Sequence, residues 1–354
     1  MSEKEKNKIC LVSRRFDEDS GRCEWVYAER LKEEMERRNF NVFKIEQENA
    51  EINTSPFKKI FHDYFIVLFE LLNKRFSENI RIFHFLNENQ AVYSWLIRLT
   101  GAKTITTFHD FINLNSKDKK RRIYFKFIYK LASLSDIVIF NSMKTKEEFW
   151  KLYGLDKKNY LIPVINYSVF PIENKNKTIR KIGFLGVREP RKNVLEFVKL
   201  AKLIKNKKSR FKIDLWGARG SLEEELIKQI KEKELGEIIE IKGIAPGKKI
   251  NEIFNSFDFL FSPTKEEGLG VALIEPMFCG VPVFILENSK IPEEVKKCCI
   301  ICKNTEEVFD RISKISRKDY EILVNKSLSN SEKFIQFNAK NNFEKLAKLY
   351  NELI

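Results

Sequence analysis

The sequence is poor in the residues that build several common kinds of protein. Its 354 residues include only three histidines, six cysteines, nine prolines and 13 glycines. So little glycine and proline excludes a fibrous or low-complexity chain. The strongly apolar stretch Ile60–Leu72 contains His62, Asp63 and Glu70, and it is too short to cross about 30 Å of hydrocarbon as a helix. We expect it to form a buried helix; the less favoured alternative is an interfacial one.

The few cysteines give no disulfide framework. Cys298, Cys299 and Cys302 lie close together, and the spacing of the last two suits a metal or redox pair. No second pair or nearby histidine accompanies them, and the alternation with isoleucine favours a short buried strand. The charged start, Met1–Lys6, is not followed by a signal-type apolar run. We therefore expect a reduced, cytoplasmic protein without a bound metal.

Positive charge is in excess, with a formal net charge of +15. The excess is even: residues 1–170 carry 30 basic and 23 acidic residues, and residues 171–354 carry 35 and 27. An even excess suits an enzyme with anionic substrates, or weak affinity for acidic membrane surfaces. Nucleic-acid binding usually concentrates positive charge on one face, so we expect no nucleic-acid partner.

Strand-like and helix-like segments alternate through the first half. Apolar runs end in polar or turn residues, and the stripe from Trp25 to Met35 has helical spacing. The expected strands are Lys8–Ser13, Asn41–Ile45, Ile80–Phe85, Lys103–Phe108 and Asp136–Phe140. This order predicts a parallel sheet with helical crossovers, and we assign residues 1–170 to an N-terminal Rossmann-like domain.

The pattern restarts after the polar stretch 171–177. The expected strands are Lys181–Gly186, Phe211–Gly217, Ile238–Ile241, Phe257–Phe261 and Pro282–Ile285, with helices between them. We assign residues 171–335 to a C-terminal Rossmann-like domain and expect the helix of 336–354 to pack back on the N-terminal domain. The fold class is α/β, with two doubly wound domains facing each other across a cleft.

The most informative segment follows the expected strand Phe257–Phe261. Gly268 and Gly270 let the backbone approach a ligand closely, and free N–H groups at the start of the next helix are donors for a phosphate. Glu267 and Glu275 flank this turn, and their carboxylates can accept hydrogen bonds from sugar or ribose hydroxyls. Anion donors beside hydroxyl acceptors are typical of a nucleotide-sugar site.

This segment resembles a known signature. The Glu267-x7-Glu275 pattern, within Glu-Gly-Leu-Gly, Ile-Glu-Pro-Met and Cys-Gly-Val-Pro-Val, is similar to that of retaining GT-B glycosyltransferases of the family 4 type. Residues 186–193 resemble the family's phosphate-binding loop, and His109-Asp110 resembles its His-Asp pair. The resemblance implies transfer of a hexosyl unit from a UDP- or GDP-linked sugar to a hydroxyl of a glycan or lipid-linked glycan. It implies retention at the anomeric carbon, without a metal or other cofactor.

The resemblance also implies that the domain of residues 1–170 binds the acceptor and that the domain of residues 171–335 binds the donor. It further implies roles for the donor-side residues. Glu275 would accept hydrogen bonds from the ribose, and Glu267 would face the donor sugar as a catalytic residue. Lys192, catalytic and donor-binding, would neutralise the departing diphosphate together with Arg188. The remaining donor-side residues are expected to contribute backbone groups or to frame the nucleobase: Gly268, Leu269, Gly270, Gly217 and Ile244.

On the acceptor side, the resemblance implies that His109 is catalytic and points into the cleft near the transferred sugar. It also implies that Gly21 belongs to the first loop, near acceptor and diphosphate. Two departures from the family pattern stand out. Val187 occupies the place where the family usually has an arginine, so Arg188 comes one residue late. The first loop has one glycine, Gly21, where the family commonly has two.

Two further segments have alternative interpretations. Asp17-Glu18-Asp19 has the spacing of some metal sites, but its place in the first loop favours a solvated acidic cluster. The basic, aromatic segment Lys117–Lys130 predicts a helix that either packs its aromatic face on the sheet or binds an anionic membrane at the cytoplasmic face.

For the whole chain, the alternatives are a nucleotide-sugar epimerase-like enzyme on the same fold and a non-catalytic sugar-nucleotide-binding protein.

Overall fold

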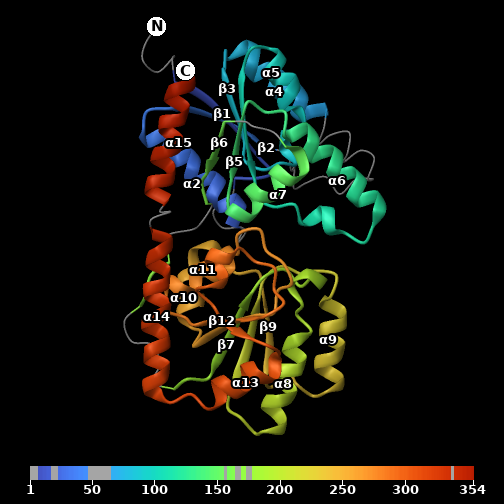
Figure 1. The fold of residues 1–354 in the computed structure, drawn as a ribbon, viewed down its shortest axis with the longest axis vertical. Helices are drawn as coiled ribbons and strands as arrows, with labels where there is room; N and C mark the ends of the chain where they lie inside the picture. The colour runs from blue at the N-terminus through green and yellow to red at the C-terminus, as the bar shows by residue number, and fades with distance from the viewer. Residues whose placement is uncertain are drawn as a thin grey trace. The chain divides into compact units, whose positions relative to one another are not determined.

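The computed structural model describes residues 7–16, 23–46, 65–154, 158–163, 169–172, 178–335 and 339–354 (Figure 1). Its internal contacts divide the chain into two units. The first contains Met1–Glu18, Arg22–Val164 and Ala339–Ile354, and most of the second is Ile165–Asn338. Each unit is an α/β layer structure around its own sheet, which confirms the prediction of two doubly wound domains.

The first unit contains a six-stranded parallel sheet with the order β2-β1-β3-β4-β5-β6. Its strands are β1 (Lys8–Ser13), β2 (Asn41–Glu46), β3 (Ile82–Phe85), β4 (Lys103–Phe108), β5 (Ile137–Phe140) and β6 (Asn159–Leu161). Five of the six were expected from their apolar runs. The sixth, β6, is a short edge strand of half-buried residues, so it carries little apolar signal.

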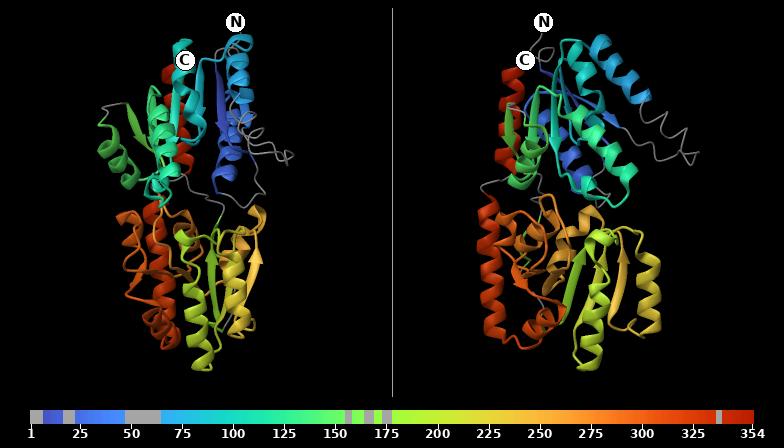
Figure 2. Two further views of the ribbon diagram at one scale, coloured as in Figure 1. Left: turned by 90° about the vertical axis from the view of Figure 1, so that its right-hand side faces the viewer. Right: turned by 45° about the vertical axis from the view of Figure 1, so that its right-hand side comes forward.

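Helices cover both faces of this sheet because successive strand side chains point to opposite sides (Figure 2). Ile9 and Leu11 of β1 join the core under α2 and α15, whereas Cys10 and Val12 join the core on the other face. The helices are α2 (Cys23–Arg37), α4 (Val67–Ser77), α5 (Ser94–Leu99), α6 (Lys119–Ala132), α7 (Met143–Tyr153) and α15 (Ala339–Leu353), with short helices η2 (Gln90–Tyr93) and η3 (Ile112–Asn115).

The expectation of a buried helix at Ile60–Leu72 is only partly correct. The described part begins at Phe65, and α4 buries Val67 and Leu71 against the sheet. Phe65 and Phe69 are exposed. Hydrophobic composition predicted a helix here, but it did not predict that one side of the helix would carry uncovered aromatic rings.

The second unit repeats the architecture with the strand order β12-β11-β10-β7-β8-β9, again all parallel. Its strands are β7 (Lys181–Leu185), β8 (Lys212–Trp216), β9 (Ile239–Gly243), β10 (Phe259–Ser262), β11 (Val283–Leu286) and β12 (Ile300–Cys302). Its helices are α8 (Glu196–Asn206), α9 (Glu223–Glu232), α10 (Ile250–Asn255), α11 (Val271–Phe278), α12 (Glu293–Lys296), α13 (Thr305–Ser313) and α14 (Arg317–Ile335), with short helices η4 (Pro190–Lys192) and η5 (Gly247–Lys249).

The prediction of a short buried strand at the cysteine cluster is only partly correct, because β12 begins after Cys299 and its Ile301 is exposed. Cys302 is buried in β12, and Cys298 is buried just before it. Burial raises the pKa of the Cys299 thiol above its ordinary value, so this thiol is not a reactive thiolate. Within the described ranges, no group of three or more His, Cys, Asp or Glu side chains is arranged to hold a metal ion.

The last two helices belong to different units. In the second unit, α14 packs on α11, and its Asn330 side chain donates to the Cys298 carbonyl. In the first unit, α15 buries Tyr350, whose hydroxyl lies 2.5 Å from His84 Nδ1. Burial lowers the pKa of His84 to about 3, so this histidine is neutral and structural. None of the helices in the described ranges combines the length and the apolar character needed to span a bilayer.

Candidate functional site

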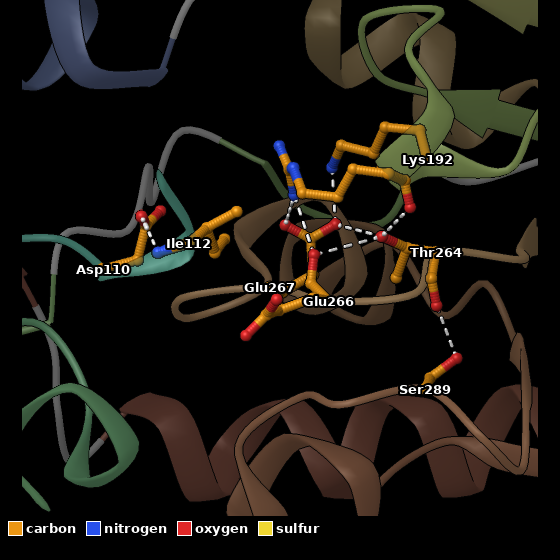
Figure 3. Close-up of polar contacts among 8 residues, drawn as sticks. Asp110, Ile112, Lys192, Thr264, Glu266, Glu267 and Ser289 are labelled. Carbon is orange, nitrogen blue, oxygen red and sulfur yellow. Dashed lines mark hydrogen bonds and ion pairs between the residues drawn. The ribbon is translucent and has the colours of Figure 1, made fainter. Parts of the chain in front are cut away.

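The candidate donor site of the second unit is built at the carboxyl ends of its parallel strands, where ligands of open α/β sheets bind. Strand β10 ends at Ser262, and a buried loop leads to α11. Gly270 caps α11 with φ 86°, a left-handed conformation that favours glycine. Hydrogen bonds to the segment after β11 fix the loop: Glu267 N donates to the Lys290 carbonyl over 3.1 Å, and Ser289 Oγ donates to the Thr264 carbonyl over 2.6 Å (Figure 3).

Glu267 is the centre of a buried polar cluster (Figure 3). Lys192 Nζ lies 2.5 Å from Glu267 Oε1, and Thr264 Oγ1 donates to the same oxygen over 2.9 Å. Arg191 Nη1 lies 3.0 Å from Oε2. Backbone hydrogen bonds join the two loops, since Lys265 N donates to the Arg191 carbonyl over 2.9 Å. The structure therefore brings Glu267 and Lys192 together, as the sequence predicts, and adds Arg191 and Thr264.

Electrostatics keep Glu267 ionised. Burial alone would raise the pKa of its carboxyl, but the positive charges of Lys192 and Arg191 outweigh this effect, and the pKa lies below its ordinary value. A carboxylate can only accept hydrogen bonds. Glu267 is therefore suited to accept hydrogen bonds from hydroxyl groups and unsuited to donate a proton.

Arg188 has a different environment from the one that the sequence suggests. Its side chain is almost fully buried, forms an ion pair with Glu223 at the start of α9, and donates to the Gly217 carbonyl over 2.8 Å. The guanidinium thus connects the turn after β8 to the start of α9 and stabilises both. Its predicted contact with a donor has no support from this geometry, whereas the neighbouring Arg191 contacts Glu267 directly. The sequence analysis assigned no role to Arg191, although its place one residue before Lys192 was an available signal.

The other predicted donor-side residues lie at the same edge of the sheet or in α11. Gly217 follows β8 with φ 136°, and a Cβ there would meet the Gly186 carbonyl oxygen at 2.0 Å, so only glycine fits. Ile244 follows β9 and is 57% exposed. Glu275 is buried in α11. Strands β7, β8, β9 and β10 thus all present predicted site residues at their carboxyl ends.

In the first unit, a second polar cluster surrounds His109 at the carboxyl end of β4. His109 Nε2 lies 2.8 Å from the Leu86 carbonyl, which can only accept, so Nε2 carries the proton. Nδ1 faces Asn141 Nδ2 at 3.5 Å, and Thr145 Oγ1 donates to the His109 carbonyl. Asp110 Oδ1 accepts from Ile112 N over 3.0 Å (Figure 3). Ser142, which follows β5, is the N-cap of α7. Gly21 and Asp17-Glu18-Asp19 lie outside the described residues.

Sequence reasoning missed Glu88, which follows β3 and holds the His109 loop. Its Oε2 accepts from His109 N over 3.1 Å, and the side chain is buried. Burial, and then the nearby charge of Asp110, raise the pKa of Glu88 well above its ordinary value; Glu24 acts in the same direction. A buried glutamate after a short strand has no local sequence signature, because its partners come from other elements.

The raised pKa of Glu88 gives a stability prediction with a definite sign. The folded state favours the protonated carboxyl, so its contribution is fully present below the ordinary pKa of about 4.3 and is lost as the pH rises towards the raised pKa. Glutamine keeps the acceptor but cannot ionise. Glu88→Gln is expected to raise the melting temperature relative to the wild type at pH 8 more than at pH 5.

The control is Glu147→Gln, a change at an exposed glutamate in the same unit. Its melting temperature should follow that of the wild type from pH 5 to pH 8. A stabilisation by Glu88→Gln that is constant with pH, or that is larger at pH 5, would contradict the assignment.

Comparisons with known proteins identify the family. The model of Glycosyltransferase Family 4 matches residues 24–164, and that of Glycosyl transferases group 1 matches residues 168–332. Among curated proteins, the O-antigen chain mannosyltransferase B of Escherichia coli is 29% identical over 114 residues. That match spans 32% of this chain and 30% of the relative's length.

Solved structures match nearly the whole chain. Sucrose-phosphate synthase from Thermosynechococcus elongatus gives a TM-score of 0.80 at 15% identity, with 98% of this chain and 99% of the other covered. WaaG, a glycosyltransferase involved in lipopolysaccharide biosynthesis, gives 0.72 at 12% identity, covering 97% and 99%. Anabaena Alr3699/HepE in complex with UDP and glucose gives 0.71 at 13% identity, covering 98% and 99%. These likenesses show the fold, and the two family models together account for most of the sequence. The chain therefore belongs to the group 1 glycosyltransferases with the GT-B fold.

Proposed function

We propose that this glycosyltransferase moves a hexosyl unit from a UDP- or GDP-linked sugar to a hydroxyl of a glycan or lipid-linked glycan, with retention of anomeric configuration and without a metal ion. The observation that carries the proposal is the buried cluster of Lys192, Arg191 and Glu267 beside the glycine-containing turn before α11. It combines cations for a diphosphate with an acceptor for sugar hydroxyls.

The two cations replace a metal in this proposal. When a sugar is transferred, the bond between its anomeric carbon and the diphosphate oxygen breaks, and negative charge develops on that oxygen. Lys192 and Arg191 approach the two oxygens of Glu267 from fixed loops, so their charges are already in place before a donor binds. Preorganised charges stabilise a leaving group strongly because they need not reorganise during the reaction.

We propose retention because the two site residues best placed to act as a nucleophile or a base, Glu267 and His109, already have hydrogen-bond partners in the described structure. Glu267 is ionised and occupied by three donors, and His109 Nε2 is bound to the Leu86 carbonyl. We therefore assign Glu267 to sugar hydroxyls rather than to attack on the anomeric carbon. The acceptor oxygen forms the new bond on the face from which the diphosphate departs, and a diphosphate oxygen takes the acceptor's proton. His109 and Gly21 are assigned to the acceptor side, near the transferred sugar.

Similar proteins support this donor class. Anabaena Alr3699/HepE was solved with UDP and glucose, and the pneumococcal O-GlcNAc transferase GtfA with UDP and GlcNAc. GtfA gives a TM-score of 0.60 at 17% identity. The curated relative is named a mannosyltransferase. The shared chemistry is a hexose activated by a nucleoside diphosphate.

A panel of nucleoside-diphosphate sugars tests the proposal. A ligand that binds the folded protein raises its melting temperature by mass action, so the hit identifies base and sugar together. Incubating the hit with glycan acceptors should then give a product with the donor's anomeric configuration in the presence of a chelator. Release of an epimerised sugar without an acceptor would favour the epimerase-like alternative, and binding without turnover would favour a non-catalytic protein.

Glu275 provides a prediction for the nucleotide half of the donor. We assign its buried carboxylate to the ribose hydroxyls. Hydrogen bonds to charged groups contribute about 1.5–3 kcal/mol, so Glu275→Ala should weaken nucleotide binding about 10- to 100-fold. The loss should be similar for UDP or GDP and for the matching nucleoside, because the ribose is common to both.

Isothermal titration calorimetry measures this loss. Glu293→Ala, at an exposed glutamate of α12, is the matched control and should bind like the wild type. Unchanged nucleoside affinity in Glu275→Ala would remove Glu275 from the ribose site.

We also propose that the protein works in the cytoplasm and makes peripheral contact with the anionic face of the membrane. A lipid-linked glycan presents its sugar at the membrane surface, so an enzyme that uses it gains from residence there. The formal net charge of +15 favours such a surface. The even spread of basic residues over the two halves of the sequence argues against a nucleic-acid partner.

A further inference from the structure

Helix α6 is firmly held on one side of the first unit, on the sheet face opposite α15 (Figure 1). Asp118 caps its start by accepting from Lys120 N over 2.9 Å. Ile128 and Tyr129 are buried in the core, and the Tyr129 hydroxyl accepts from Asn113 Nδ2 over 3.0 Å. This side of the helix is the packing face that the sequence predicts.

The other side of α6 carries large apolar side chains that are about half exposed or more. Ile123, Tyr124 and Phe127 are 60%, 47% and 61% exposed. Ile123 and Phe127 are four residues apart and therefore lie one above the other on the same helix face. An isolated exposed apolar residue is ordinary, but three neighbouring ones on one helix face form a patch that indicates a partner.

Lysines surround this patch. Lys120 lies within its angular range, and Lys119, Lys126 and Lys130 lie along its edge at helical spacing. Helix α6 contains no acidic residue. In the part of the chain that the structure describes, Lys119, Lys120 and Lys126 form no ion pair with an acidic side chain. Their charges are thus available to a partner.

We propose that α6 lies in the headgroup layer of an anionic bilayer, with Ile123, Tyr124 and Phe127 inserted towards the acyl chains and the lysines bound to lipid phosphates. Aromatic and aliphatic side chains beside lysines are the composition of interfacial helices. This inference rests on the membrane contact proposed above and names the surface that makes it. It does not depend on the identity of the donor or of the acceptor.

Charge alone would not distinguish a membrane from a soluble polyanion. A nucleic acid or an acidic polysaccharide could pair with the lysines but would leave Ile123 and Phe127 in water. Only a partner with an apolar layer beneath a negatively charged surface matches both properties of this helix face. The experiment therefore needs one arm for the apolar side chains and one for the charges.

The apolar arm compares wild type with Ile123→Ser/Phe127→Ser in sedimentation with sucrose-loaded vesicles. Wild type should bind phosphatidylcholine vesicles that contain phosphatidylglycerol and should not bind phosphatidylcholine alone. The double variant should lose binding to the anionic vesicles. Ile322→Ser, an equivalent change at a 54% exposed isoleucine of α14, should bind like wild type.

The charge arm uses Lys119→Gln/Lys120→Gln/Lys126→Gln. Each lysine near an anionic surface contributes about a fivefold change in binding, so the triple variant should bind on the order of 100-fold more weakly. The control removes three exposed lysines from the second unit: Lys202, Lys207 and Lys231.

If the two triple-lysine variants lost vesicle binding equally, only the net charge of the protein would matter, and the proposal would be overturned. Failure of wild type to sediment with anionic vesicles would overturn it as well. Heparin binding that is unchanged by Ile123→Ser/Phe127→Ser, together with unchanged vesicle binding, would assign the surface to a soluble polyanion. Nucleotide calorimetry on the same variants should match wild type, so a failure here is separate from a failure of the donor-site proposal.

Discussion

Lys192→Ala is expected to slow glycosyl transfer by about 100- to 1,000-fold, the usual effect of removing one preorganised donor to a developing charge. Lys192 Nζ contacts Glu267 Oε1 in a buried position, so a donor diphosphate bound at this loop would meet an almost dehydrated ammonium group. The loss should appear mainly in kcat, because negative charge on the diphosphate is greatest as the sugar leaves.

The fold should survive this change. Glu267 keeps Arg191 at 3.0 Å and Thr264 Oγ1 at 2.9 Å, so its buried carboxylate is not left without partners. Lys199→Ala, at an exposed lysine of α8, controls for loss of charge and should retain full activity. Wild-type kcat in Lys192→Ala, measured with the donor identified by the thermal panel, would refute the assignment.

The strands and the donor-side turn were the most predictable features. Phe257–Phe261 and Lys181–Gly186 are apolar runs flanked by turn residues, and each forms a strand displaced by two residues or fewer at either end. Glu267 and Lys192 lie in different segments of the sequence, yet parallel strands bring their carboxyl ends to one edge of a sheet. Their contact could therefore be expected from sequence order and fold class.

Features that depend on packing between distant elements could not be predicted. The burial of Arg188 depends on Glu223, which comes from the start of another helix. The sequence fits α6 equally well as a helix with a covered or an uncovered aromatic face, because periodicity does not specify how much of a helix its neighbours cover. Glu88 was missed for the same reason, since its partner His109 comes from the next strand.

Arg188 and Arg191 provide the second large prediction, because the structure gives them different partners: Arg188 pairs with Glu223, and Arg191 pairs with Glu267. Removing one partner of a buried ion pair leaves an uncompensated charge and destabilises a protein by about 3–5 kcal/mol. Arg188→Met should therefore lower the free energy of unfolding of the second unit by about this amount, since Glu223 would remain buried without its partner. Urea titration followed by circular dichroism measures this loss.

Arg191→Gln should behave differently. Its side chain is 31% exposed, so the loss of its ion pair with Glu267 should change stability by less than about 1 kcal/mol. If Arg191 holds the diphosphate, the affinity for UDP or GDP should fall about tenfold or more, whereas the affinity for the nucleoside should not change. Calorimetry with both ligands separates these effects.

A double variant decides between the two roles of Arg188. Replacing both partners, in Arg188→Met/Glu223→Leu, removes the unpaired charge and should recover much of the lost stability. If Arg188 only braces the turn after β8 and the start of α9, this double variant should also bind the diphosphate like wild type. Recovered stability with lost diphosphate affinity would instead make Arg188 a ligand of the donor, because a well-folded site would then lack only its guanidinium.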